Sequence, residues 1–231
     1  RGFPRMMPFP GGIESTANGT LILSAAAALL YLGMVEREAN LRRTAAKTLA
    51  VALLALLAVL EDGSPLLAAA LALSAIGDAF LSRDGEQAFL AGLACFLVAH
   101  LVYVALFALS GQGFGIIAQE FWRPLAGALM IAATAFLLFR LRTAVDGPMR
   151  NAVTAYAAAI LAMGLSALTV PGPWVALGAA LFMTSDALLG TEKFLLAGNG
   201  ETRRTLRHAI WVLYYTAQLM IVLAGLLPLS A

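Results

Sequence analysis

The chain has 231 residues, of which 61% are hydrophobic and only 12% are charged. A typical soluble domain has roughly 45–50% apolar and about 25% charged residues, so this composition excludes an ordinary soluble domain. Each bilayer crossing takes about 20 residues, which leaves room for roughly eight or nine spans and for no separate soluble domain. The net charge of +2 comes from short basic clusters without interleaved aromatic residues, so no nucleic-acid partner is expected. The single cysteine, Cys95, excludes a disulfide framework and a thiolate metal site.

The chain begins with a segment rich in proline and glycine, residues 1–18, which predicts a disordered leader before a single transmembrane domain over residues 19–231. Turn residues and charges divide this domain into apolar runs, each long enough for one bilayer crossing. The runs fall at about residues 19–35, 44–60, 65–82, 88–110, 124–141, 150–169, 174–190 and 207–228. The sequence therefore predicts an all-α, polytopic membrane protein with eight transmembrane helices.

Basic residues gather on one side of the predicted membrane. The first, third, fifth and seventh connections hold twelve of the fifteen Lys and Arg residues, whereas the other side holds only Arg1, Arg5 and Arg123. The positive-inside rule assigns the basic connections to the cytoplasm and both termini to the outside. A composition rich in alanine and leucine is typical of a bacterial inner (plasma) membrane protein.

A short motif occurs twice. The third run ends in LALSAIGDAFLS and the seventh in AALFMTSDALLG, so that Asp78 and Asp186 occupy equivalent positions. Four helices in each half mean that the halves run in the same direction, related by a pseudo-twofold axis along the membrane normal. The sequence thus predicts two parallel repeats, at about residues 19–110 and 124–228.

Asp78 and Asp186 are the only acidic residues inside the predicted runs. A carboxylate in hydrocarbon costs at least ~2.5 kcal/mol, so each either faces a polar interior or, as a neutral group, hydrogen-bonds neighbouring helices together. Their occurrence at equivalent positions favours a functional role. Each lies about one turn from the cytoplasmic end of its run, so we expect the two carboxyl groups to face each other at one depth. Such a pair shares a proton, and one acid beside one base is the arrangement that hydrolysis requires.

Other polar residues are expected near this pair. His100 has Tyr103 one turn further along the same helix face, a spacing that favours a lined cavity over an isolated buried histidine. The corresponding stretch of the second half holds Tyr214, Tyr215 and Gln218. Helix rise puts His100 and Gln218 about 10 Å deeper than the aspartates, where they are expected to line a channel for a lipid tail.

Tyr156 and Lys47 are expected near the cytoplasmic depth of the two aspartates. Two roles remain open for Lys47, because its ammonium group can extend to the interface or bind a lipid phosphate.

Several chemistries are not supported. His100 and His208 cannot supply a three-histidine zinc site, and the sequence has no HExxH, no GxSxG and no glycine-rich phosphate loop. Gly77-Asp78 resembles part of the GxGD motif of intramembrane aspartyl proteases, but Ala75 stands where the first glycine belongs and Ser185 precedes the other aspartate. No metal and no cofactor are expected.

These residues together resemble the YhhN, or transmembrane protein 86, family of lysoplasmalogenases. The similarity runs from about Lys47 to Leu223, although Thr48 replaces the proline that follows the lysine in the family pattern. Its motifs are Gly77-Asp78 with Leu81; Gly92, Phe96, His100 and Tyr103; Tyr156 and Met163; Gly178, Phe182, Ser185 and Asp186; and Tyr214 with Gln218.

The resemblance implies a multi-pass hydrolase that cleaves the vinyl ether bond of a lysoplasmalogen to a fatty aldehyde and a glycerophospho-base. This reaction needs one positioned acid and one negative charge but no metal, which fits two carboxyl groups. We expect one of Asp78 and Asp186 to be the acid and the other to stabilise the cation and orient water, without deciding which. Ser185, Tyr156, Tyr215 and Gln218 are candidates to position water or substrate, and the site is expected to open toward the cytoplasmic leaflet.

Two other readings stay open. The same cavity suits a hydrolase that releases fatty acid from acyl lysophospholipids, although no activated serine is evident. Paired intramembrane acids in parallel repeats also suit a non-enzymatic, proton-coupled transporter of lipids or small molecules.

Overall fold

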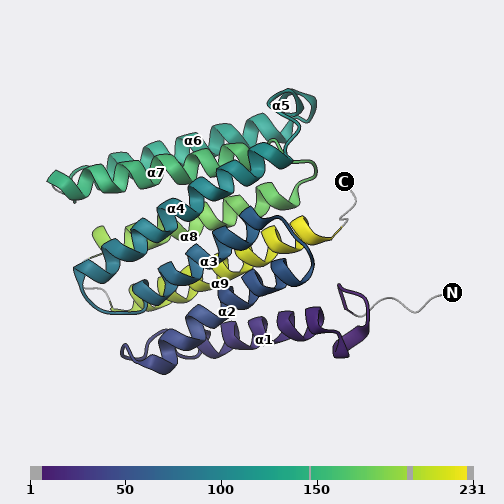
Figure 1. The fold of residues 1–231 in the computed structure, drawn as a ribbon. Helices are drawn as coiled ribbons and strands as arrows, with labels where there is room; N and C mark the ends of the chain where they lie inside the picture. Colours follow the sequence, from purple (N-terminus) through teal and green to yellow (C-terminus); the bar gives the residue numbers. More distant parts are fainter. Residues whose placement is uncertain (1–6, 146, 197–199, 228–231) are drawn as a thin grey trace.

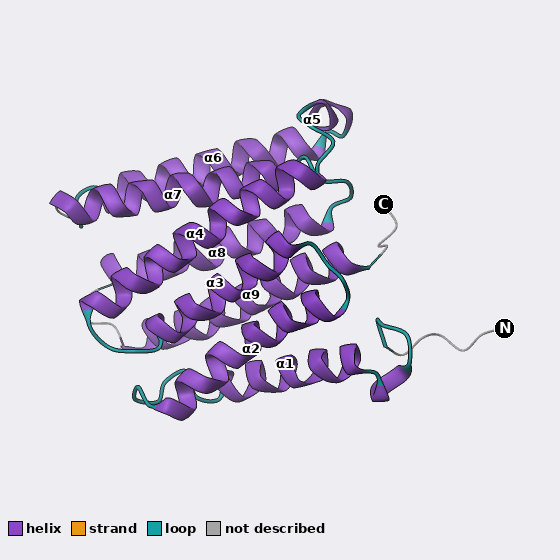
Figure 2. Ribbon diagram, in the orientation of Figure 1, coloured by secondary structure: helices purple, strands orange, loops and turns teal. Residues whose placement is uncertain are grey.

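The computed structural model describes residues 7–145, 147–196 and 200–227, and this part of the chain contains helices and no strands (Figures 1 and 2). A 3-10 helix, η1 (Gly12–Glu14), comes first. The α-helices that follow are α1 (Thr16–Leu32), α2 (Leu41–Leu60), α3 (Pro65–Leu81), α4 (Glu86–Ser110), α5 (Gly115–Gln119), α6 (Trp122–Leu141), α7 (Gly147–Ala167), α8 (Trp174–Phe194) and α9 (Gly200–Leu226). Apart from the short α5, each helix corresponds to one of the predicted apolar runs. The prediction of an all-α fold is therefore confirmed.

Local signals fix where several helices begin. The Ser15 side chain accepts a hydrogen bond from the Asn18 N–H at the start of α1, and Asn40 does the same for Arg43 at the start of α2. Pro65 occupies the first turn of α3, where its missing N–H has no intrahelical partner to lose.

The sequence predicted a disordered leader over residues 1–18, but residues 7–18 are ordered in the structure. Residues 1–6 lie outside the described residues, but Phe9 is buried and both its N–H and its C=O bond the Asn18 side chain. Asn18 thus joins this segment to α1, and residues 7–15 form a turn and a short helix against it.

The long helices lie side by side and alternate in direction (Figure 1). In Figure 1, α6 and α7 form one flank, α1 forms the other, and α3, α4, α8 and α9 lie between them. The α1–α2, α3–α4 and α6–α7 connections meet at one end, together with the last turn of α8 and the first turn of α9. We call it the basic end, because it holds these residues: Arg37, Arg42, Arg43, Lys47, Arg83, Arg140, Arg142, Arg150, Lys193, Arg203, Arg204 and Arg207.

Among the described residues, five helices are long and apolar enough to cross a membrane, namely α2, α4, α6, α8 and α9. Two further apolar helices, α1 and α3, have 17 residues each. Large hydrophobic side chains point outward along the flanks, among them Leu23 and Leu29 on α1 and Leu129 and Phe136 on α6. Such surfaces suit lipid rather than water, so the chain is a multi-pass helical membrane protein.

Close helix contacts support both aspartate-bearing helices. A Cβ on Gly77 of α3 would lie 2.7 Å from the Phe96 ring of α4, and one on Gly178 of α8 would lie 2.8 Å from Ile221 of α9. Glycine at these positions lets each helix pair approach closely. The pairs α3–α4 and α8–α9 thus form a tight support for Asp78 and Asp186.

Candidate active site

Asp78 lies in a closed, ion-paired environment between α2, α3 and α9. Its side chain is only 1% exposed, and its Oδ1 lies 3.1 Å from the Lys47 Nζ. The Tyr214 hydroxyl donates a 2.7 Å hydrogen bond to the other oxygen, Oδ2. A cation and a hydroxyl donor both favour the ionised carboxylate, so we describe Asp78 as one half of a buried ion pair.

A hydrogen-bonded chain extends from Asp78 into the bundle. The Gln218 amide nitrogen donates to the Tyr214 hydroxyl at 3.4 Å, and the Tyr103 hydroxyl donates to the Gln218 carbonyl at 2.5 Å. Tyr103 and Gln218 are fully buried, and these bonds satisfy their polar groups. The chain fixes the orientation of Tyr214 and, through it, that of Asp78.

Asp186 has different surroundings, formed by α4, α7 and α8. The Tyr156 hydroxyl donates a 2.5 Å hydrogen bond to its Oδ2, and the side chain is 11% exposed. The His100 Nε2 lies 3.8 Å from the same oxygen, which is too long for a direct hydrogen bond. No Lys or Arg lies within ion-pair distance of Asp186 among the described residues.

His100 is enclosed by aromatic rings. Its ring lies edge-on to those of Tyr156 and Phe182, with centroids 5.2 and 4.9 Å away, and beside that of Phe96. The side chain is fully buried, and neither ring nitrogen has a hydrogen-bond partner among the described residues. Buried polar groups of this kind are uncommon away from functional sites, and the Nε2 faces Asp186.

The two aspartates do not share a hydrogen bond among the described residues. Each carboxyl group has its own tyrosine donor, Tyr214 for Asp78 and Tyr156 for Asp186. The sequence predicted two carboxyl groups that face each other and share a proton, one as acid and one as base. In the part of the chain that the structure describes, Asp78 is ion-paired with Lys47, whereas Asp186 has no cationic partner.

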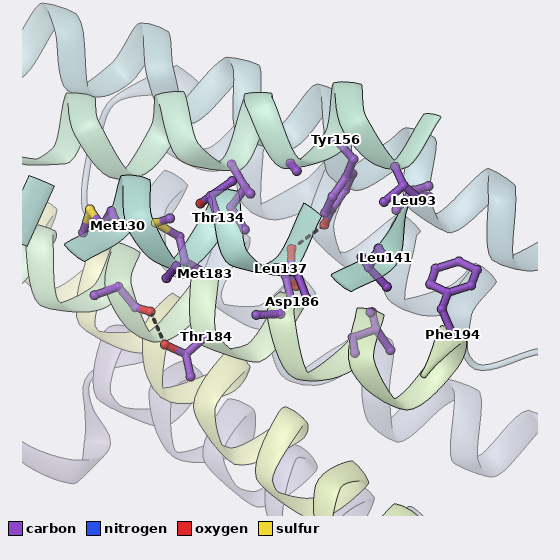
Figure 3. Close-up of a pocket in the computed structure, with 18 of the residues that line it drawn as sticks. Leu93, Met130, Thr134, Leu137, Leu141, Tyr156, Met183, Thr184, Asp186 and Phe194 are labelled. Carbon is purple, nitrogen blue, oxygen red and sulfur yellow. Dashed lines mark hydrogen bonds between the residues drawn. The ribbon is translucent and has the colours of Figure 1, made fainter. Parts of the chain in front are cut away.

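A cavity of about 440 Å³ lies between α4, α6, α7 and α8, and Asp186 and Tyr156 form part of its wall (Figure 3). Most of the other lining residues are apolar, and Asp78, Lys47 and His100 are not among them. Figure 3 shows Met130, Thr134 and Met183 to one side of Asp186, and Leu141 and Phe194 to the other. The cavity is therefore an apolar channel with a carboxyl group part-way along its length.

The sequence predicted that His100 lies about 10 Å deeper in the membrane than the two aspartates, and this prediction was wrong. Asp186 was expected one turn from the end of its helix, but α8 continues to Phe194, about 12 Å beyond Asp186 at 1.5 Å per residue. Asp78 lies only about 5 Å from the end of α3 at Leu81 by the same measure. Distances counted from helix ends therefore misplaced Asp186 relative to His100, whose Nε2 lies within 3.8 Å of it.

Some predicted site residues have other partners. Lys47 points inward to Asp78 instead of extending to the interface. The Ser185 hydroxyl donates to the Ile210 carbonyl and so joins α8 to α9. The Tyr215 hydroxyl bonds Ser24 of α1 at 2.8 Å, away from both carboxyl groups.

Sequence reasoning missed the wall that α6 contributes to the cavity. That wall consists of residues such as Ala126, Ala133 and Leu137, which differ in no visible way from residues that face lipid. Within the described residues there is also no group of three or more His, Cys, Asp or Glu side chains that could hold a metal ion.

Comparison with known proteins gives a consistent result. The profile described as the YhhN family matches residues 42–225. A lysoplasmalogenase of Mycobacterium bovis is 37% identical over 158 residues, which cover 66% of this chain and 57% of that protein. Lysoplasmalogenase TMEM86B of Homo sapiens is 34% identical over 70% of this chain and 63% of its own length. Lysoplasmalogenase TMEM86A of Bos taurus is 29% identical over 67% of this chain and 62% of its own length.

The chain thus spans about three fifths of the length of the curated relatives that it matches. No solved structure matches the chain.

Proposed function

The chain belongs to the YhhN family, and on that basis we propose that it is a lysoplasmalogenase with Asp186 as its catalytic acid. The substrate is a lysoplasmalogen, whose vinyl ether bond is hydrolysed to a fatty aldehyde and a glycerophospho-base. One observation carries the assignment: the Asp186 carboxyl group lines an apolar cavity of about 440 Å³ and has no cationic partner among the described residues. The names of the relatives support the same activity.

The first chemical step is transfer of a proton from the Asp186 carboxyl group to the vinyl carbon that is not bonded to oxygen. The carbon–carbon double bond supplies the electron pair, and an oxocarbenium ion forms at the neighbouring carbon. Asp186 becomes a carboxylate in the same step and lies beside the new positive charge, which it stabilises. The Tyr156 hydroxyl, 2.5 Å from Oδ2, donates to that carboxylate.

The second step adds water to the oxocarbenium carbon. The Asp186 carboxylate accepts a proton from the water, so the acid of the first step becomes the base of the second. The resulting hemiacetal breaks its bond to the glycerol oxygen, which takes up the hemiacetal hydroxyl proton as the aldehyde forms. One water molecule is consumed, and Asp186 ends the cycle protonated.

Asp78 and Lys47 keep the net charge of the site balanced in this scheme. Their charges cancel, so the site carries no net charge when Asp186 holds its proton. This neutrality matters because an unbalanced charge is costly in a low-dielectric interior. His100 can stabilise Asp186 in its ionised form. Its Nε2 lies 3.8 Å from Oδ2, and ordinary N–H···O lengths are roughly 2.9–3.2 Å. A movement of less than about 1 Å therefore lets His100 donate a hydrogen bond to the Asp186 carboxylate.

We also propose the membrane arrangement that the charge pattern supports. All eight long helices cross a cytoplasmic or inner membrane, the basic end faces the cytoplasm, and both termini face outside. The active site then opens toward the cytoplasmic leaflet. The occurrence of Asp78 and Asp186 at equivalent positions of α3 and α8 supports two parallel four-helix repeats.

The experiment is product analysis with three single-chain lipids: a lysoplasmalogen, its saturated alkyl-ether analogue and an acyl lysophospholipid. Purified wild-type protein, Asp186→Asn and a matched control, Asp84→Asn in the exposed α3–α4 connection, are compared after thermal melting shows that all three are folded. We expect aldehyde from the vinyl ether alone, with wild type and Asp84→Asn but not with Asp186→Asn.

Other outcomes contradict the proposal in distinct ways. Fatty acid from the acyl lipid would assign the cavity to an esterase. Recovery of all three lipids unchanged in several detergents would remove the catalytic role and favour transport or binding.

A further inference from the structure

We propose that the lipid enters the cavity sideways from the bilayer, through a slot between α6 and α8 that is bounded by Ala133 and Thr184. The inference rests on the proposed function for the identity of the lipid, a single-chain phospholipid of the cytoplasmic leaflet. It adds the route of access and the side chains that control it.

The slot is identified by residues that line the cavity and are also exposed. Leu129 and Ala133 of α6 and Thr184 of α8 meet both conditions, and Leu129 is 62% exposed. On this basis we place the opening of the cavity at these three exposed side chains. The cavity therefore continues into the membrane between α6 and α8.

Contacts at two levels limit the length of the slot. At the deeper level, Met130, Leu168 and Ala176 form a small apolar cluster that joins α6, the end of α7 and α8. Near the basic end, a Cβ on Gly190 of α8 would lie 3.8 Å from the Leu141 side chain of α6. The stretch of α6 between Met130 and Leu141 is about 16 Å long at 1.5 Å per residue, and Asp186 lies beside it (Figure 3).

The chemistry of the slot suits a hydrocarbon chain. Ala133 has a small side chain, and the Thr184 hydroxyl is already bonded to the Ala180 carbonyl of its own helix at 2.8 Å. An apolar chain can therefore pass without breaking a hydrogen bond to either side chain.

The basic end gives the lipid its direction. Phe89 and Phe194 line the cavity there, and the Lys193 ammonium group lies 4.7 Å from the centroid of the Phe89 ring. Arg142 of the α6–α7 connection is at the same end. A phosphate headgroup at the basic end of the cavity lies near the positive charges of Lys193 and Arg142. The hydrocarbon chain of the lipid then extends past Asp186 toward Met130, with its first carbons near the Asp186 carboxyl group.

Two matched pairs of variants test the slot. Ala133→Trp and Thr184→Trp fill it from opposite sides, and either variant tests the idea if the other does not fold. Their controls are Ala132→Trp and Leu177→Trp, which add the same ring at exposed positions of the same helices that do not line the cavity. Each protein in lipid vesicles is exposed to an alkyl-ether lysophospholipid with a diazirine in its chain, irradiated and mapped by mass spectrometry, and its turnover of lysoplasmalogen is measured in parallel.

We expect the wild type and both controls to be labelled on the α6 and α8 segments around residues 129–137 and 180–187. Ala133→Trp and Thr184→Trp should lose at least tenfold in labelling and in kcat/KM, whereas the controls stay within twofold. Labelling confined to other helices, or equal labelling in slot and control variants, would overturn the slot even in an active enzyme. Labelling of the slot in a wild type without turnover would retain the slot and reject the proposed reaction.

Discussion

The surroundings of Asp78 and those of Asp186 use the same residue types in different ways. Asp78 is closed in by Lys47 and Tyr214 and does not reach the cavity, whereas Asp186 has Tyr156 beside it and forms part of the cavity wall. Each carboxyl group has one tyrosine donor, so the tyrosines do not make the difference. The difference comes from Lys47 and from the cavity. Lys47 favours the ionised form of Asp78, whereas Asp186 lines an apolar cavity in which its carboxyl group can exchange a proton with a substrate. In the proposed mechanism, Asp78 therefore has a structural role and Asp186 a chemical one.

The largest expected effect separates the two carboxyl groups by activity. Asp186→Asn removes the transferable proton at nearly constant shape, and we expect vinyl ether hydrolysis to fall about 1,000-fold, within the range of general acid catalysis. Steady-state rates in detergent measure this loss, and the melting temperature shows whether the fold is retained. An Asp186→Asn protein with more than a tenth of the wild-type rate would exclude Asp186 as the acid.

The next effect concerns stability on the Asp78 side. Lys47→Met leaves the Asp78 carboxylate buried without its cation, and we expect a loss of about 3–5 kcal/mol in the free energy of unfolding. Adding Asp78→Asn removes the unpaired charge, so the double variant should recover most of that stability. Denaturation of the two variants gives the comparison, and a double variant no more stable than Lys47→Met would contradict the ion-pair description.

Removal of the hydroxyl of Tyr156 and of Tyr214 is expected to affect activity and stability differently. Tyr156→Phe removes a donor to the carboxylate that forms during the reaction, and a hydrogen bond to a charged group is worth about 1.5–3 kcal/mol, or roughly 10- to 100-fold in rate. Tyr214→Phe removes the equivalent donor to Asp78. We expect it to lower the melting temperature while kcat falls less than tenfold. Rates and melting curves of both variants test this, and equal loss of kcat would mean that the carboxyl groups act as one symmetric pair.

The smallest expected effect is that of a substitution at Tyr215, which lies outside the proposed active site. Tyr215→Phe removes the hydrogen bond to Ser24, which lies between α9 and α1 and contacts neither carboxyl group. We expect about 1 kcal/mol of stability to be lost and the rate to stay within twofold of wild type. Kinetic assays of this variant beside Tyr214→Phe check the assignment, because a large loss of rate would place Tyr215 in the active site.

The sequence predicted the elements of the fold well because each long helix carries its own apolar run and several helices carry their own start signals. It also singled out Asp78 and Asp186, since an acid within an apolar run is conspicuous. It did not predict which side chain each aspartate meets, because the pairing of Lys47 with Asp78 depends on the rotation and tilt of two helices. The extension of α8 was missed because the predicted run ended at residue 190, where the apolar stretch ends. In the structure α8 continues to Phe194, and Arg203 bonds the Glu192 carboxylate in its last turn.

The cavity could not be predicted for a similar reason. It arises where small residues on facing helices, such as Ala133, Ala157 and Gly190, leave space between them. In an alanine-rich chain, the residues that line a cavity and those that face lipid have the same composition. Only the arrangement of the helices separates them.

The most direct test of the central claim is hydrolysis of a lysoplasmalogen in heavy water by wild type, by the Lys47→Met/Asp78→Asn double variant and by Asp186→Asn. Proton transfer to carbon predicts an aldehyde with one deuterium on the carbon next to the carbonyl, beyond the exchange seen when unlabelled aldehyde is incubated alone. The account predicts this product from wild type and from the folded double variant, in which the site stays neutral, and none from Asp186→Asn. Labelled aldehyde formed by Asp186→Asn at the wild-type rate, or a wild-type product without deuterium on that carbon, would contradict it.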